Sequence, residues 1–181
     1  MRIFFDTEFT QFRDGQMLSA GFVSEDDRTF YVEIDEPARR RSASDFCQEH
    51  VISQFGLVPA AAVRSDAEAG KRIAEWILSF DSTVMLCYDY KLDWRFFETS
   101  VRAAGLWRQL APLVQDCNIA SDCNQDSALA AQESYLAQGR RPGRHHALTD
   151  AYALRQRWRE YERLTAAHSA TSPPDPLRQA P

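Results

Sequence analysis

The sequence predicts an α/β or α+β fold built on one mixed sheet, because strand-like segments come first and helical segments alternate with strands after them. Its 181 residues suit a single domain with a substantial core. The first strand-like run, Ile3-Phe4-Phe5, is apolar at consecutive positions. Such a run indicates a central strand that is buried on both faces.

The first three strands are expected to form a meander. Residues 13–15 (Arg-Asp-Gly) are typical of a turn, and residues 17–23 form the second predicted strand. A hairpin turn at residues 24–27 leads into residues 28–34, where apolar and polar residues alternate. The segment from Pro37 through the arginine triplet is predicted to be a loop.

Helices and short strands are expected over the remainder of the chain. The best-marked helix begins after Ser65, since Glu68 three residues on completes a capping box and apolar residues recur on one face up to Phe80. The predicted helices span residues 44–55, 65–80, 93–106, 127–138 and 146–166, and the predicted strands span residues 83–87 and 113–119.

One domain is therefore expected over residues 1–166. Residues 167–181 carry proline and polar residues without periodicity, so they are predicted to be a disordered tail. No apolar run reaches membrane-spanning length and no signal-peptide pattern opens the chain, so we expect a cytoplasmic protein with no membrane partner. The four cysteines lack C-x-x-C spacing, which favours free buried thiols over disulfides or a zinc site.

The net charge of −5 argues against a protein that binds nucleic acid by general electrostatic attraction. It leaves open an enzyme that reaches nucleic acid through metal ions bound to carboxylates. Basic residues gather at 39–41 and at 140–144. The first group is interpreted as a solvated loop, and the second lies beside two histidines.

Asp6 and Glu8 follow the buried first strand. Residues two apart in a strand point to the same face, so these two carboxylates should project side by side. Like charges at this spacing repel each other unless a cation lies between them. Alone, the pair fits a solvated strand end as well as a metal site.

A third carboxylate, Asp93, stands where the strand at 83–87 gives way to a helix. Ligand sites in open α/β sheets lie at such strand ends. A helix N-cap explains an aspartate here equally well, and Asp89 is a rival four residues earlier.

Near the C-terminus, His145 and His146 precede Asp150 in the first turn of the last predicted helix. An aspartate there also interacts favourably with the helix dipole, and two adjacent histidines are compatible with an ordinary loop.

Taken in order, these residues resemble the DEDD superfamily of 3′–5′ exonucleases, in its histidine-containing (DEDDh) subtype. The resemblance covers residues 2–160, and its His-x4-Asp spacing selects His145 over His146. Bulky Phe96-Phe97 after Asp93 favours that residue over Asp89. The matching residues are Asp6, Glu8, Asp93, His145 and Asp150.

The segments Phe-Phe-Asp-Thr-Glu-Phe, Leu-Ser-Ala-Gly-Phe-Val and His-Ala-Leu-Thr-Asp-Ala look most like a compact bacterial and phage branch of this superfamily. That branch includes the mycobacterial polyadenylate-specific exoribonuclease and a phage DNA exonuclease. The resemblance implies a ribonuclease H-like α/β fold with a mixed five-stranded sheet flanked by helices. It also implies a homodimer, since several small relatives dimerise.

The resemblance further implies two Mg²⁺ (or Mn²⁺) ions, which balance four carboxylates in charge. Asp6, Glu8, Asp93 and Asp150 are the expected metal ligands, and Glu8 also counts among the catalytic residues. His145 is the expected general base, since an ordinary imidazole pKa near 6.5 suits that role.

The expected activity is hydrolysis of single-stranded RNA from its 3′ end to nucleoside 5′-monophosphates. Backbone amides near Thr7 and Phe9 would hold the terminal ribose. Phe9 or Trp94 would stack on a base, although either ring also fits a core position. Arg140, Arg141 or Arg144 would contact the phosphate backbone, and Arg144 is the one counted among the substrate-binding residues.

RNA is favoured over DNA as the partner. The same chemistry on single-stranded DNA is the nearest alternative, and a non-catalytic nucleic-acid-binding module is an alternative from another class.

Overall fold

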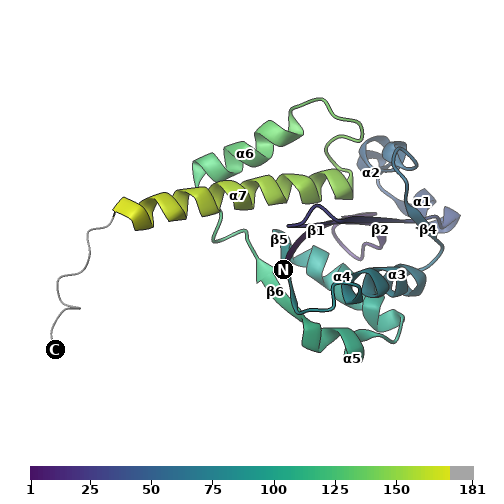
Figure 1. Ribbon diagram of the computed structural model, residues 1–181. Coiled ribbons are helices and arrows are strands. Elements are labelled where there is room, and N and C mark those ends of the chain that lie inside the picture. Colours follow the sequence, from purple (N-terminus) through teal and green to yellow (C-terminus); the bar gives the residue numbers. More distant parts are fainter. Residues whose placement is uncertain (172–181) are drawn as a thin grey trace.

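A computed structural model of the protein contains one six-stranded mixed sheet with helices on both faces (Figure 1). It describes the backbone of residues 1–171 and the side chains of residues 1–168. The predicted α/β class is thereby confirmed. Most of the predicted tail, residues 172–181, lies outside the described residues.

The strands run in the order β4-β3-β2-β1-β5-β6 across the sheet. The pairs β1–β2 and β2–β3 are antiparallel, which confirms the predicted meander, and the other pairs are parallel. The strands are β1 (Arg2–Phe9), β2 (Met17–Ser24), β3 (Thr29–Ile34), β4 (Ala61–Val63), β5 (Val84–Tyr88) and β6 (Val114–Asn118).

Helices α6 and α7 cover one face of the sheet, while α3 and α4 cover the other (Figure 1). None of the helices in the described part of the chain is long and apolar enough to cross a membrane. The helices are α1 (Pro37–Ser42), α2 (Asp45–His50), α3 (Asp66–Leu78), α4 (Lys91–Ala103), α5 (Trp107–Leu110), α6 (Asp126–Leu136) and α7 (Ala147–Thr171), with 3₁₀ turns η1 (Ile52–Gln54) and η2 (Ala111–Leu113).

Several boundaries differ from the sequence predictions. The sheet has six strands where five were expected. The additional strand, β4, pairs with β3 over only three residues, which is too short a segment to predict from the sequence. The expected loop at the arginine triplet is helix α1, which begins at Pro37 and buries Arg39. The predicted helix over residues 44–55 divides into α2 and η1, and α7 continues beyond the predicted end at residue 166.

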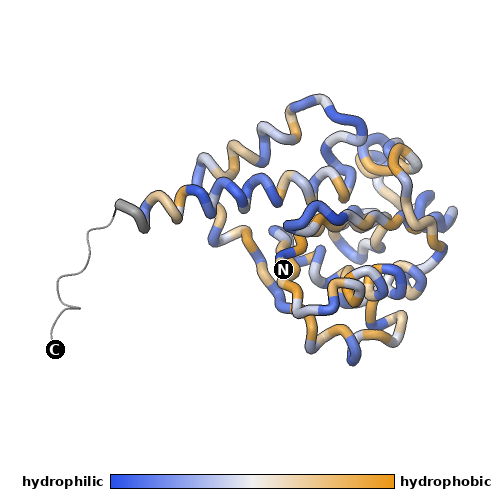
Figure 2. Tube along the Cα trace, in the orientation of Figure 1, coloured by the Kyte–Doolittle hydropathy of each residue, from blue (hydrophilic) through white to orange (hydrophobic). Residues whose placement is uncertain are grey.

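The two faces of β1 pack against different helices. Ile3 and Phe5 belong to the large core between the sheet and helices α3 and α4, where Phe5 stacks on Phe22 with ring centroids 5.3 Å apart. Phe4 packs on the opposite side, against Leu154 of α7. Figure 2 shows hydrophobic residues concentrated along the strands and the helix sides that meet them. Because side chains alternate along a strand, Asp6 lies on the α7 side of β1.

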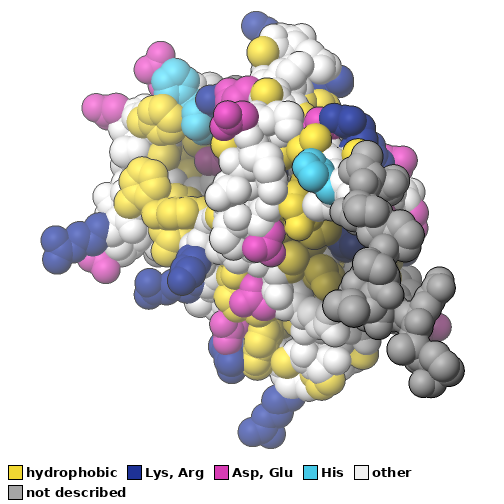
Figure 3. All heavy atoms as spheres, turned by 90° about the vertical axis from the view of Figure 1, so that its left-hand side faces the viewer, with side chains coloured by type: hydrophobic (Ala, Val, Ile, Leu, Met, Phe, Trp, Pro, Cys, Tyr) yellow, Lys and Arg dark blue, Asp and Glu magenta, His cyan; other side chains and the backbone are white. Residues whose placement is uncertain are grey.

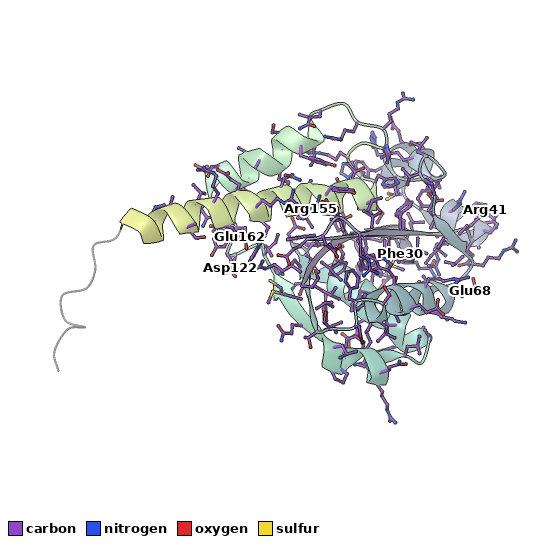
Figure 4. All side chains as sticks on the ribbon, viewed as in Figure 1. Phe30, Arg41, Glu68, Asp122, Arg155 and Glu162 are labelled. Carbon is purple, nitrogen blue, oxygen red and sulfur yellow. The ribbon has the colours of Figure 1, made fainter. Side chains whose placement is uncertain are left out.

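A buried arginine ties α7 to the hairpin between β2 and β3. Arg155 points from α7 toward the sheet (Figure 4) and donates to the Ser24 carbonyl at 2.8 Å. Its guanidinium also pairs with Asp27, N to O at 2.6 Å. Both partners satisfy a charge that would otherwise be costly to bury.

Gly21 allows the start of α7 to approach the sheet. It lies in β2 opposite Asp6 of β1. A Cβ at this position would lie 2.2 Å from the backbone nitrogen of Leu148, so no larger residue fits without a backbone shift. The glycine thus determines how closely the first turn of α7 sits over the strand that carries Asp6.

We expect Gly21→Ala to lower the free energy of unfolding by about 1–3 kcal/mol, the usual range for overpacking a filled site. The added methyl group meets backbone atoms, which cannot rotate away as a side chain would. Urea denaturation of wild type and variant measures the difference. An unchanged unfolding midpoint and slope would contradict the close approach.

Candidate active site

Five predicted site residues line a single cavity of about 450 Å³: Asp6, Glu8, Asp93, His145 and Asp150. They come from β1, α4, α7 and the loop before α7. Potential ligand atoms of Glu8, His145 and Asp150 lie within 4.8 Å of one another, as do those of Asp6, Asp89 and Asp93. The structure therefore brings together residues that are far apart in the sequence.

Asp6 lies beyond the end of the pairing between β1 and β5. That parallel pairing runs from Arg2 opposite Met85 to Phe4 opposite Cys87. Strand β1 continues past it, paired only with β2 on its other side. Asp6 and Glu8 therefore project at the carboxyl edge of the parallel strands, where α4 begins and where ligand sites occur in such sheets.

Asp93 is held by Thr7. Its Oδ1 accepts hydrogen bonds from the Thr7 backbone N–H at 3.1 Å and from the Thr7 hydroxyl at 2.7 Å. Helix α4 begins at Lys91, so Asp93 stands in its first turn and is not the N-cap. Both Thr7 donors are thus engaged by Asp93, and a ribose contact from the backbone amides near Thr7 and Phe9 stays a prediction.

Asp150 holds the backbone of the loop that carries His145. Its Oδ2 accepts from the His145 N–H at 2.9 Å. His145 has φ +63°, a left-handed conformation in which histidine is enriched among non-glycine residues. Its ring lies edge-on to Phe46, with centroids 4.9 Å apart.

The neighbouring histidine is placed differently. His146 is 1% exposed, and its ring centroid lies 4.4 Å from that of Tyr31. Burial lowers its pKa to about 4, so the ring is neutral. His145 faces the cavity and His146 does not.

Burial raises the pKa of all four carboxyl groups. The pKa of Asp93 rises to about 7, and so does that of Asp150. The pKa values of Asp6 and Glu8 also lie well above their ordinary range, first because of desolvation and then because of the neighbouring carboxylates. In His145, burial and the nearby Arg144 lower the pKa, which leaves a neutral imidazole at neutral pH.

Three carboxylate oxygens in the cavity are buried and have no hydrogen-bond partner among the described residues: Asp6 Oδ2, Asp93 Oδ2 and Asp150 Oδ1. Buried polar atoms without partners are uncommon and costly. Carboxylate oxygens are the donors that Mg²⁺ and Mn²⁺ prefer. The residues present thus fit divalent cations.

Asp89, the sequence rival of Asp93, already has a cationic partner. Its Oδ2 lies 3.4 Å from Nη1 of Arg157, a buried arginine on α7. Asp89 lines a smaller adjoining cavity of about 200 Å³, whereas Asp93 lines the larger one. The geometry therefore favours Asp93 as the fourth carboxylate of the main cavity.

Aromatic side chains form the apolar part of the cavity lining. Phe12 is 75% exposed, Phe46 50% and Tyr90 48%. Phe9 also lines the cavity, stacked on Phe96 at 5.3 Å and edge-on to Phe12 at 5.4 Å. Figure 3 shows hydrophobic and histidine side chains gathered around a hollow on one face of the molecule.

The sequence does not single out Phe12 or Tyr90, and Phe46 lies within the helix predicted over residues 44–55. A large aromatic next to the polar turn at residues 13–15 is a signal that could have identified Phe12. The other two are recognisable only once the fold places them at the cavity.

Two predicted substrate-binding residues lie outside this cavity. Trp94 packs on Tyr88 and Trp107, with ring centroids 5.9 and 6.3 Å away, and so occupies the core position that was its alternative. Arg144 does not line this cavity, but it lines the smaller adjoining one together with Asp6, His145 and Asp150, and it pairs with Glu133 of α6.

Comparison of the chain with protein-family models gives no match, and comparison with curated proteins gives none either. A functional interpretation therefore depends on the residues of the cavity.

We expect the metal-free protein to lose stability as pH rises from about 4 to about 7. In this range the folded protein holds protons on Asp93 and Asp150 that the unfolded chain, with ordinary pKa values near 3.8, has released. Denaturant titrations in EDTA should show a free energy of unfolding about 5 kcal/mol lower at pH 8 than at pH 5, roughly half of it from each of these two carboxyl groups.

The Asp93→Asn/Asp150→Asn double variant is the control, because amides do not titrate. Its free energy of unfolding should vary less between the two pH values. An identical pH profile in wild type and double variant would contradict the shifted pKa values.

Proposed function

We propose that the protein is a metal-dependent 3′–5′ exonuclease of the DEDDh type, acting on single-stranded RNA and releasing nucleoside 5′-monophosphates. The observation that carries this proposal is the convergence of four carboxylates and one neutral histidine in a single cavity, with three buried carboxylate oxygens unpartnered among the described residues. A ribonuclease H-like fold is part of the proposal. The order β3-β2-β1-β5-β6 fits the expected five-stranded sheet, with β4 added at the edge.

Asp6, Glu8, Asp93 and Asp150 would hold two Mg²⁺ or Mn²⁺ ions, whose four positive charges balance four carboxylates. When bound, such ions activate a water molecule and stabilise the leaving oxygen of a phosphodiester. Thr7 keeps one oxygen of Asp93 fixed, so the other is directed to the cavity. The protein thus presents its ligands in a preorganised arrangement.

His145 is suited to accept the proton of the attacking water. Its depressed pKa keeps the imidazole neutral, and a neutral ring nitrogen can take a proton. The Asp150 carboxylate fixes the His145 backbone, and Phe46 supports the ring. Asp150 would therefore serve both as a metal ligand and as an anchor for the general base.

The aromatic lining supports a nucleotide substrate over a small phosphate ester. A nucleotide offers an anionic phosphate to the metal ligands and a flat base to aromatic rings such as Phe12 and Tyr90. Stacking is worth about 1–3 kcal/mol per base and requires an unpaired base. This combination supports a single-stranded polynucleotide.

The same reaction on single-stranded DNA is the second candidate. Thr7 donates both its N–H and its hydroxyl to Asp93, which removes one contact expected for a ribose. A contact to the 2′-hydroxyl is the feature that distinguishes RNA from DNA, so this observation strengthens the DNA alternative. A cytoplasmic location and a homodimer stay predictions.

Hydrolysis of matched 5′-labelled RNA and DNA oligonucleotides tests the function. With Mg²⁺ or Mn²⁺ we expect a ladder shortened from the 3′ end, faster on RNA, and no products in EDTA. Asp6→Asn should lower kcat by about 10³-fold or more, because an amide replaces a charged ligand shared by the site.

Asp122→Asn is a matched control, since Asp122 is an exposed aspartate outside the cavity. It should retain full activity. Hydrolysis that persists in EDTA or in Asp6→Asn would contradict the proposal, and equal rates on both polymers would contradict the RNA preference.

Replacing Phe12 by alanine should raise KM about tenfold with little change in kcat, because the ring would bind the base without contacting the reacting phosphate. Phe12→Leu keeps an apolar side chain but loses the π-face, and we expect an intermediate KM. Steady-state kinetics on a short oligonucleotide give both constants. Leu129→Ala, at an exposed hydrophobic residue on α6, is the control; an unaltered KM in Phe12→Ala would exclude Phe12 from base binding.

A further inference from the structure

A second, polar groove of about 410 Å³ lies next to the cavity. Arg140, Arg141 and Arg144 line it from the loop between α6 and α7, and His50 and Gln54 line it from α2 and η1. Figure 2 shows this connecting loop as a strongly hydrophilic stretch.

One aromatic side chain separates the groove from the cavity. Phe46 lines the cavity, and its ring lies 4.7 Å from that of His50, which lines the groove. The same ring lies 4.9 Å from that of His145. A ligand that extends past Phe46 on this side therefore passes from the general base directly to the arginines.

The groove is basic in a chain whose net charge is −5. Its lining has three arginines and a single carboxylate, Glu49. Arg141 is exposed and makes no hydrogen bond or ion pair within the part of the chain that the structure describes. Arg140 has only neutral partners, the Gln138 Oε1 at 2.6 Å and the Tyr135 ring at 4.5 Å. Two guanidinium groups thus remain without a carboxylate partner.

The groove is built on a fixed backbone. The side chain of Gln54 donates to the Arg144 carbonyl at 2.8 Å and accepts from the Gly143 N–H at 2.7 Å. These two bonds join η1 to the loop immediately before His145. The arginines and the general base therefore share one anchored segment.

We propose that this groove binds phosphates of the nucleic-acid strand on the 5′ side of the scissile bond, so that the enzyme acts on polynucleotides in preference to dinucleotides. The inference rests on the proposed function. A dinucleotide has one phosphodiester, which must lie at the carboxylate cluster to be cut. Any phosphate in the groove belongs to upstream nucleotides, and guanidinium groups bind phosphate oxygens in a bidentate manner.

The test compares a dinucleotide with a 12-mer of the same 3′ end, using the Arg140→Ala/Arg141→Ala double variant. We expect kcat/KM to fall about tenfold on the 12-mer and less than twofold on the dinucleotide. The slope of log(kcat/KM) against log[salt] on the 12-mer should become shallower by about 1.4, the value for two lost phosphate contacts on a single strand. Arg140→Lys/Arg141→Lys should restore most of that slope.

Arg108→Ala is the matched control, an exposed arginine on α5 at the other side of the sheet (Figure 1). Arg108→Ala should leave kcat/KM unchanged on both the dinucleotide and the 12-mer. If the double alanine variant lost kcat/KM equally on both substrates, or lost none on the 12-mer, the groove would not bind upstream phosphates. The proposal that the protein is an exonuclease would be unaffected by that result.

Failure of the proposed function gives a different result, since wild type would then hydrolyse neither substrate. Fluorescence anisotropy of a labelled 12-mer still decides the groove in that case. Binding that weakens about tenfold in the double alanine variant, but not in Arg108→Ala, would support it. Equal binding by wild type and double variant would overturn it.

Discussion

One unfavourable interaction constrains this fold throughout: four carboxyl groups are buried together in one cavity, where they repel each other and lose contact with water. Asp6, Glu8, Asp93 and Asp150 would each be more stable ionised in water, yet three elements bring them together. Strand β1 supplies two of them at a spacing that puts both on one face. Helices α4 and α7 each supply one from the first turn.

Hydrogen bonds and close packing hold this arrangement against the repulsion. Thr7 binds Asp93 with two donors, and the backbone of His145 binds Asp150. Gly21 lets α7 approach β2 opposite Asp6. The hydrogen bonds to Asp93 and Asp150 each leave the second oxygen of the carboxylate without a partner among the described residues. Together with the close packing at Gly21, they restrict the motion by which the carboxylates could separate. If the cluster binds cations as proposed, the protein accepts a less stable metal-free state in return for a preorganised site.

The sequence predicted those elements whose structure depends on residues that are close together in the chain. The β1–β3 meander followed from apolar runs and turn residues, and the cap of α3 is present, with the Ser65 hydroxyl accepting from the Glu68 N–H. The residues of the cavity could be chosen because their order resembles a family pattern. Strand β4 could not be predicted, since three residues carry no periodicity and pair only because β3 lies beside them.

Other features depend on contacts between residues far apart in the chain. Helix α1 is stabilised through Arg39, which pairs with Asp66 and donates to the Met17 carbonyl. The distinction between Asp89 and Asp93 depends on Arg157, which neutralises only the former. No local pattern reveals such partners, so the helix at the arginine triplet was missed.

Calorimetric titration of Mn²⁺ into the metal-free protein, in two buffers of different ionisation enthalpy, tests the central claim that the carboxylate cluster is a divalent-cation site. At pH 6 protons remain on groups such as Asp93 and Asp150, so binding must displace them. The account predicts two bound ions with proton release at pH 6 and much less release at pH 8. Absence of binding, or binding at pH 6 without proton release, would contradict it.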